Sequence, residues 1–243
     1  MPSAPRRLLI RSGKHLLRAL TEFQGRHSLV PTTPFLPADT FSWEAELRSA
    51  TPDIHAELMA LLPQLDSIPA FHQISPDQAR ISQGDHWKTF ILMVFGQGIA
   101  ANQAQCPSTS ALLSRLPGLQ NAWFSILAPG YHIPPHRGPT RALVRAHLGL
   151  VIPTPPERCW IRVADERRSW SEGDCMLFDD TYEHEVRNDT DQHRIVLFMD
   201  FDRPMDRVGT LLNRLLIRML KASAYVKDPL KNLARLADAQ TPR

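Results

Sequence analysis

The chain has 243 residues, of which 43% are hydrophobic and 22% charged. This composition indicates a globular protein with a sizeable core and excludes global disorder. The 28 Lys and Arg residues stand against 25 Asp and Glu residues, for a formal charge of +3. With no basic-aromatic motif present, this small excess excludes nucleic acid as a partner. Three cysteines without CxxC spacing favour a reducing cytoplasmic location and provide neither a disulfide framework nor a zinc site.

Both ends of the chain carry basic amphipathic sequence. Residues 1–20 place leucines between arginines and lysines and lack the continuous apolar core of a signal peptide. Residues 207–236 repeat the pattern, with apolar residues at helical spacing between Arg214, Arg218 and Lys221. Each helix can either pack its apolar face on the core or lie on an anionic membrane surface. The sequence leaves both open, so a cytoplasmic protein with peripheral contact to the inner membrane is one expectation.

A helix is predicted over residues 41–65 from the spacing of its apolar residues. Thr51 and Pro52 have the residue types of an N-cap and of a first-turn proline, so we expect a helix to begin there.

From Trp87 onward the pattern shortens to strand-like runs that are separated by Pro, Gly, Asn and Asp. The runs are 87–96, 123–129, 143–153, 159–164, 175–180 and 193–201. Prolines between residues 107 and 156, including Pro134 and Pro135, are expected to mark turns. The pattern is typical of a mainly β fold with flanking helices, built as an antiparallel jelly roll or double-stranded β-helix like that of the cupins.

This pattern divides the chain into three predicted parts. Residues 1–85 form a helical preface that packs on the barrel. Residues 86–205 form the barrel, and residues 206–243 form basic amphipathic helices.

Side-chain alternation along two of these runs predicts buried polar groups. Arg145 and His147 share one face of their strand, opposite a face of small and apolar residues, and Arg194 shares a face with Val196 and Phe198. Because the planar guanidinium matches a carboxylate, Arg145 and Arg194 are plausible partners for the two ends of a dicarboxylate. The dicarboxylate that also chelates iron is 2-oxoglutarate.

Two long segments carry a resemblance to a known family. They read PPHRGPTRALVRAHLGLVIP and RVADERRSWSEGDCMLFDDTYEHEVRNDTDQHRIVLFMDFDRP. They resemble the aspartyl/asparaginyl beta-hydroxylase family of iron(II)- and 2-oxoglutarate-dependent dioxygenases, in its bacterial branch. The resemblance implies that His136 and His184 ligate iron. It also implies that Ser125 and Arg194 hold the distal carboxylate of 2-oxoglutarate, and that Arg145 and His147 hold its metal-proximal end.

One departure from the usual iron site is shared with this family. The common facial triad has an acidic residue two positions after the first histidine, and Gly138 stands there instead. Members of the family also lack this carboxylate ligand. The resemblance implies that Asp180 supports that side of the metal without binding it, as a hydrogen-bond acceptor.

The function implied is hydroxylation of an unactivated carbon with dioxygen, on an aspartyl or asparaginyl residue or an amino acid. A first alternative is 2-hydroxylation of the acyl chain of a bacterial lipid such as lipid A or an ornithine lipid, which the proline stop and basic helix after residue 202 favour. A second alternative, of another class, is a non-catalytic barrel that binds a ligand or a partner protein. Neither the substrate, the stereochemistry nor the oligomeric state follows from the sequence.

Overall fold

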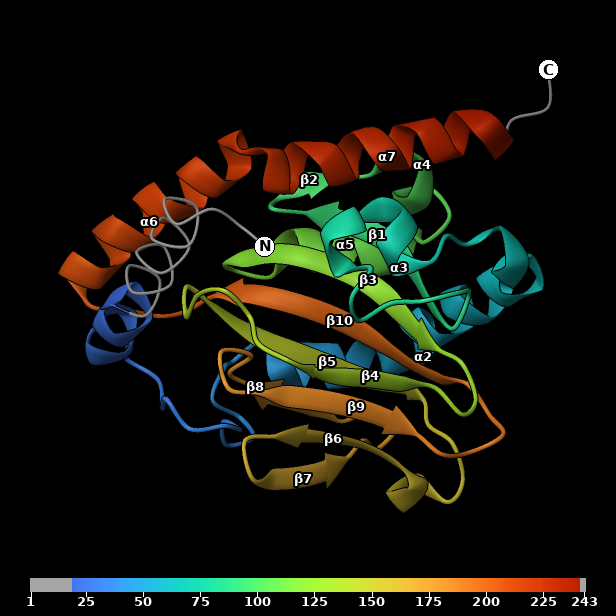
Figure 1. Cartoon of the computed structure of the whole chain (residues 1–243), viewed down its shortest axis with the longest axis horizontal. Coiled ribbons are helices and arrows are strands. Elements are labelled where there is room, and N and C mark those ends of the chain that lie inside the picture. The colour runs from blue at the N-terminus through green and yellow to red at the C-terminus, as the bar shows by residue number, and fades with distance from the viewer. Residues whose placement is uncertain (1–18, 241–243) are drawn as a thin grey trace, which may run out of the picture.

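The strand-like runs of the second half pair into two antiparallel sheets in the computed structural model, which describes residues 19–240 (Figure 1). The larger sheet has the order β2 (Gln97–Gly98), β1 (Trp87–Val94), β3 (Leu119–Leu127), β10 (Arg194–Asp202), β5 (Leu143–Val151) and β8 (Cys175–Phe178). The smaller sheet has the order β4 (His132–His136), β9 (His184–Asn188), β6 (Cys159–Val163) and β7 (Glu166–Ser169).

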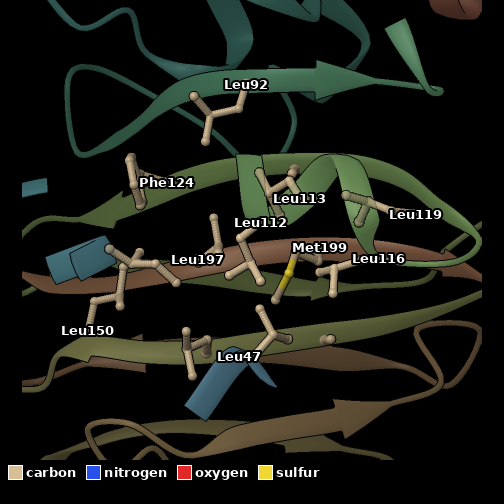
Figure 2. Close-up of a cluster of buried hydrophobic side chains, with 14 of the residues drawn as sticks. Leu47, Leu92, Leu112, Leu113, Leu116, Leu119, Phe124, Leu150, Leu197 and Met199 are labelled. Carbon is tan, nitrogen blue, oxygen red and sulfur yellow. The ribbon is translucent and has the colours of Figure 1, made fainter. Parts of the chain in front are cut away.

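The larger sheet is buried on both faces. One face packs on helices α2 (Glu44–Leu61) and α5 (Pro107–Arg115), where Phe124 and Leu197 join Leu47 in one hydrophobic cluster (Figure 2). The other face meets the smaller sheet, and Val196 of β10 packs in one cluster with Ile161 and Val186 of that sheet. The interior between the two sheets is therefore the place where the inward-facing polar residues of β3, β5 and β10 must lie.

Further short helices and two longer ones surround the sheets. The short ones are η1 (Leu62–Ser67), α3 (Phe71–Ile74), η2 (Pro76–Gln78), α4 (Ala100–Gln103) and η3 (Pro156–Arg158). Helices α6 (Arg207–Ala222) and α7 (Ala224–Gln240) follow β10 and run along one edge of the molecule (Figure 1). Residues 19–26 are helical, whereas most of the predicted amphipathic helix of residues 1–20 lies outside the described residues.

The predicted fold class is confirmed. All six strand-like runs lie on β1, β3, β5, β6, β8 and β10, and the two facing antiparallel sheets with flanking helices form a jelly roll. The two sheets stay separate in their strand pairing over residues 19–240. No helix within that range is both long enough and apolar enough to cross a bilayer. The division of the chain at residues 85 and 205 stays a prediction.

The predicted helix start at Thr51 and Pro52 is wrong. α2 begins at Glu44 and continues through Pro52, which lies in its interior. The Glu44 carboxylate accepts hydrogen bonds from the backbone N–H groups of Asp39 and Phe41, and so orders the chain just before the helix. Leu47 on one side of the proline and Ile54 on the other are both buried. Tertiary packing of both halves outweighs the backbone hydrogen bond that the proline removes.

The prediction that Pro134 and Pro135 mark a turn is also wrong, because both lie within β4. β4 is an edge strand whose only partner in the described residues is β9, so a residue without an N–H group is tolerated there. The pairing of β4 with β9 shifts register between Ile133 and His136, around the two prolines. That shift sets His136 directly opposite His184.

Candidate active site

The two predicted metal ligands form a cross-strand pair at the end of the smaller sheet. His136 ends β4, His184 begins β9, and the two residues are register partners. Their ring centroids lie 4.1 Å apart with an interplanar angle of 51°. Residues 48 positions apart in the sequence are therefore brought into side-chain contact by antiparallel pairing.

Both imidazole rings are held in one orientation by the backbone. The Nδ1 of His136 lies 2.8 Å from the carbonyl oxygen of Pro134, and the Nδ1 of His184 lies 3.0 Å from that of Tyr182. A carbonyl can only accept, so Nδ1 donates and Nε2 keeps its lone pair free for a metal. Burial lowers the pKa of His136 to about 4 and that of His184 well below its usual value. Both rings are therefore neutral at pH 7, as metal binding requires.

The Asp180 carboxylate occupies the space next to Gly138, the position that carries the acidic ligand in the common facial triad. The backbone N–H of Gly138 donates to the carbonyl oxygen of Asp180 over 2.7 Å, and a Cβ added at Gly138 would collide with the Asp180 carboxylate. Glycine at position 138 is therefore required by the space that Asp180 occupies. Burial raises the pKa of Asp180 to about 6, and the nearby Arg145 opposes this rise.

Arg145 bridges two carboxylates. It lies 3.0 Å from Asp180 and 2.9 Å from Asp200, and Asp200 is its register partner on β10. Its guanidinium also lies over the ring of Phe198, 4.4 Å from the centroid. The structure thus shows Arg145 fixing the position of Asp180, and its predicted contact with 2-oxoglutarate stays a prediction.

Arg194 is a buried cation that has no carboxylate partner among residues 19–240. Its side chain is 1% exposed, and neither Nε nor Nη1 has a hydrogen-bond partner in the described residues. The thiol of Cys159 lies close to it and partly opposes the effect of burial on its pKa, and its guanidinium lies 4.7 Å from the ring centroid of Trp170. Burial lowers the pKa of Arg194 to about 10, so it remains a cation at neutral pH.

Arg203 is a second buried arginine, and its hydrogen-bond partners are those of a structural residue. Arg203 donates to the Asp179 carboxylate over 2.8 Å, to the carbonyl of Arg141 over 2.9 Å and to that of Pro31 over 3.2 Å. Burying a cation without such partners is costly. The unpaired donors of Arg194 therefore indicate a place for an anionic ligand.

Ser125 and His147 lie near Arg194 on the same inward face. Ser125 pairs with Val196 across β3 and β10, which makes it the diagonal neighbour of Arg194, and its hydroxyl accepts a hydrogen bond from the Trp87 indole over 3.0 Å. His147 is 5% exposed, and neither ring nitrogen has a partner in the described part of the chain. The Ser125 hydroxyl and the two unsatisfied ring nitrogens of His147 thus face the interior beside the unpaired guanidinium.

An apolar cavity of about 390 Å³ leads to this site. His136, Arg145 and Asp180 line one part of it, and Ile91, Trp123, Leu143, Phe198 and Leu220 are among the apolar residues that line the rest. His184, Ser125, His147 and Arg194 do not line it. The cavity therefore reaches the metal side of the site, while the buried arginine lies behind it.

Sequence reasoning missed several residues of this site. Asp200 shares the inward face of Arg194 by simple alternation, so that pattern could have found it. Trp170 and Cys159 contact Arg194 from the connection after β7 and from the smaller sheet, and no periodic signal points to them. No three His, Cys, Asp or Glu side chains in the described ranges are grouped to hold a metal, so two histidines are the candidate protein ligands.

The buried histidines predict how the stability of the metal-free protein depends on pH. His136, His147 and His184 have lowered pKa values, so the folded protein binds fewer protons than the unfolded chain between about pH 6.5 and 4. Asp180 acts in the opposite direction, because its raised pKa keeps a proton in the folded state up to about pH 6. Three histidines outweigh one carboxyl, so the free energy of unfolding should fall as the pH is lowered through this window.

Urea unfolding of the metal-free protein at a series of pH values measures this effect. The variant His136→Ala/His184→Ala should show a shallower pH dependence than the wild type, since each neutral histidine contributes up to about 1.4 kcal/mol per pH unit. Equal slopes in the two proteins would contradict the lowered pKa values.

Comparison with known proteins shows to which family the chain belongs. The family model for aspartyl/asparaginyl beta-hydroxylase matches residues 48–204. An ornithine lipid ester-linked acyl 2-hydroxylase of Rhizobium tropici is 39% identical over 207 residues, which cover 85% of this chain and 74% of that protein. The aspartyl/asparaginyl beta-hydroxylase of Mus musculus is 39% identical over 137 residues, which cover 53% of this chain but only 18% of the mouse protein.

A third relative is the aspartate beta-hydroxylase domain-containing protein 2 of Xenopus tropicalis, 31% identical over 72% of this chain and 48% of its own length. The matched region of the family model contains every site residue described above. The chain belongs to the aspartyl/asparaginyl beta-hydroxylase family.

Proposed function

We propose that this hydroxylase depends on iron(II) and 2-oxoglutarate and acts on the acyl chain of a lipid. The observation that carries the proposal is an apolar cavity that leads to a pair of neutral, oriented histidines. The non-catalytic binding module fits less well, because a barrel that only bound a ligand would need no such pair beside an unpaired buried arginine.

The histidine pair fits an iron(II) ion. Each ring has Nδ1 committed to a backbone carbonyl, so each can offer Nε2 as a ligand in a fixed direction. The other coordination positions are left to non-protein ligands, as an iron oxygenase site requires. When bound, iron together with 2-oxoglutarate and dioxygen supplies the oxidant that inserts one oxygen atom into a C–H bond while the oxo-acid is converted to succinate and carbon dioxide.

The buried guanidinium of Arg194 fits a carboxylate of 2-oxoglutarate. Its unpaired Nε and Nη1 can each donate a hydrogen bond to an anionic ligand, and the hydroxyl of Ser125 is an additional donor nearby. A dicarboxylate bound here could place its other end toward His147, whose ring nitrogens are also unpaired. The four cofactor-binding residues predicted from the sequence thus remain our proposal, with Arg145 acting mainly through Asp180.

Asp180 would control the metal face that has no protein ligand. Arg145 and the backbone of Gly138 hold Asp180 in place, so its carboxylate can accept a hydrogen bond from a water molecule on that face. This role orients a metal-bound group and does not require Asp180 to bind iron itself. The surrounding apolar residues exclude bulk water from the reacting C–H bond.

The character of the cavity supports a lipid substrate. Apolar side chains make up the larger part of its lining, and polar groups that include Asp77, Arg80 and Arg137 line the rest together with the residues of the metal end. An acyl chain can lie along the apolar part of these walls, whereas a peptide backbone would leave polar groups unpaired against that part. The likeness to the Rhizobium acyl 2-hydroxylase over 85% of the chain points the same way. Hydroxylation of an aspartyl or asparaginyl residue remains the second candidate, favoured by the likeness to the mouse enzyme.

Substrate-dependent turnover tests the proposal directly. The anaerobically iron-loaded protein, exposed to air with 2-oxoglutarate, should form succinate faster with an acyl lipid such as an ornithine lipid than with an asparaginyl peptide. Mass spectrometry should show the lipid gaining one oxygen atom. The His136→Ala and His184→Ala variants should lose this activity by about 10²-fold or more, because each removes a metal ligand.

The outcomes separate the candidates. Hydroxylation of the peptide and not of the lipid would replace the lipid proposal with the peptide one. No succinate from any substrate, together with no calorimetric binding of 2-oxoglutarate, would favour the binding module.

Replacing Arg194 tests the co-substrate site separately from catalysis. Arg194→Met removes the charge but keeps an apolar stem of similar length, so calorimetric binding of 2-oxoglutarate should weaken by about 10²-fold or more. The free energy of unfolding of the metal-free protein should stay level or rise, because a buried unpaired cation is lost. Arg168→Met, at an exposed arginine of β7, serves as the control and should bind 2-oxoglutarate normally. Unchanged binding in Arg194→Met would refute the assignment.

Narrowing the cavity should change which lengths of acyl chain the enzyme accepts as substrate. Leu143 is half-buried and lines the cavity, so Leu143→Trp should obstruct long acyl chains with little strain on the core. We expect kcat/KM to fall about tenfold or more for long-chain lipids and much less for short-chain ones, with 2-oxoglutarate binding retained. An equal effect on all chain lengths would show that the acyl chain does not run along this cavity.

A further inference from the structure

Helix α6 has an apolar stripe that no described part of the protein covers. Of the seven large apolar side chains that are exposed in the described residues, five lie on this one helix. They are Val208 (55% exposed), Leu211 (70%), Leu212 (43%), Leu215 (54%) and Met219 (56%). Clusters of this kind mark interaction sites, whereas single exposed leucines do not.

The helix is held to the protein by a different face. Gly209, Asn213 and Ile217 are buried and recur every four residues, and Asn213 donates to the backbone carbonyl of Ala142 over 3.0 Å. Asp206 caps the N-terminus by accepting from the backbone N–H of Gly209 over 2.9 Å. The expectation that an apolar face packs on the core is therefore met by this face, and the expectation of a membrane surface stays a prediction.

A third face of α6 is basic. With about 3.6 residues per turn, Arg207, Arg214, Arg218 and Lys221 fall on one side of the exposed apolar stripe. All four side chains are exposed. Asp202 is the carboxylate near Arg214 and Lys221, so the helix keeps an excess of positive charge.

We propose that the exposed stripe of α6 docks on an anionic lipid bilayer. The apolar side chains would enter the boundary between headgroups and acyl chains, and the basic row beside them would meet anionic headgroups. This charge complementarity favours the bilayer over a second copy of the chain, because two copies of α6 packed antiparallel, stripe to stripe, would place both basic rows on the same side.

The stripe is also placed next to the proposed substrate cavity. Leu220, on the buried side of α6, and Pro229 of α7 both line the cavity that leads to His136. Figure 1 shows α6 and α7 following each other end to end along the edge of the molecule, with a bend between them. A bilayer bound by α6 would therefore lie close to the cavity, although the docking itself does not rest on the lipid substrate proposed above.

Co-sedimentation of the full chain with vesicles tests the docking. The vesicles are phosphatidylcholine with and without about 30% phosphatidylglycerol, at about 50 mM and about 500 mM salt. We expect at least about tenfold stronger binding to the anionic vesicles at low salt than to the neutral ones. Leu211→Ser/Leu215→Ser and Arg214→Gln/Arg218→Gln should each reduce that binding by about tenfold or more.

Matched controls keep the result specific to α6. Met59→Ser changes an exposed apolar residue on α2, and Arg115→Gln/Arg158→Gln removes the same charge from exposed sites elsewhere. Both should bind vesicles like the wild type, and all variants should keep the wild-type unfolding transition, because the changed side chains are exposed.

Three outcomes would overturn the proposal. The first is equal binding of the wild type to both vesicle types, and the second is wild-type binding by the α6 variants. The third is a wild-type dimer in sedimentation velocity that Leu211→Ser/Leu215→Ser converts to a monomer, since the stripe would then be covered by a second copy. Loss of hydroxylase activity alone would not bear on the docking, because vesicle binding is measured without turnover.

Discussion

The whole molecule depends on one constraint, the burial of both faces of the larger sheet. Helices α2 and α5 cover one face with an unbroken hydrophobic cluster that includes Leu47, Phe124 and Leu197. The period-two alternation of the strands then directs every second residue of β5 and β10 into the space between the sheets. His147 and Arg194 are buried on that face and Arg145 is mostly so, so most of their charges and hydrogen bonds must be satisfied inside. The site is a consequence of this confinement.

The buried polar and charged groups of the interior fall into two classes, those with an opposite charge as partner and those without. Asp179, Arg203 and the Arg145 bridge to Asp180 and Asp200 form closed networks, in which each buried charge has an opposite partner. Arg194 and His147 have no such partners in the part of the chain that the structure describes. A buried cation that remains unpaired costs stability in the free protein, and an anionic ligand that pairs with it recovers this cost on binding. The difference between Arg203 and Arg194 is thus the clearest electrostatic sign of which residues serve the fold and which serve a ligand.

The histidine pair and the C-terminal helices are connected through the apolar cavity. At one end the cavity reaches His136 and Asp180, and at the other it includes Leu220 of α6. That helix packs Ile217 inward and leaves Leu211 and Leu215 outward, so one element shapes the cavity and offers an apolar surface beside it. An acyl substrate and a docked bilayer would use the same side of the protein, which gives the unusual distribution of apolar residues on α6 a single physical rationale.

The sequence by itself indicated six of the strands and the inward and outward faces of two of them, because alternation is a local property of the chain, and its family resemblance pointed to the histidines and arginines proposed for the site. Only the tertiary structure decided that Pro52 lies inside a helix and that Pro134 lies in a strand, because packing and edge position outweighed local propensity. Tertiary pairing also decided that Asp180 fills the space beside Gly138 and that Arg145 is engaged by Asp180 and Asp200. Such contacts join residues that are distant in the chain. Their partners are set by strand register and by the packing of one sheet on another, and no local pattern encodes these.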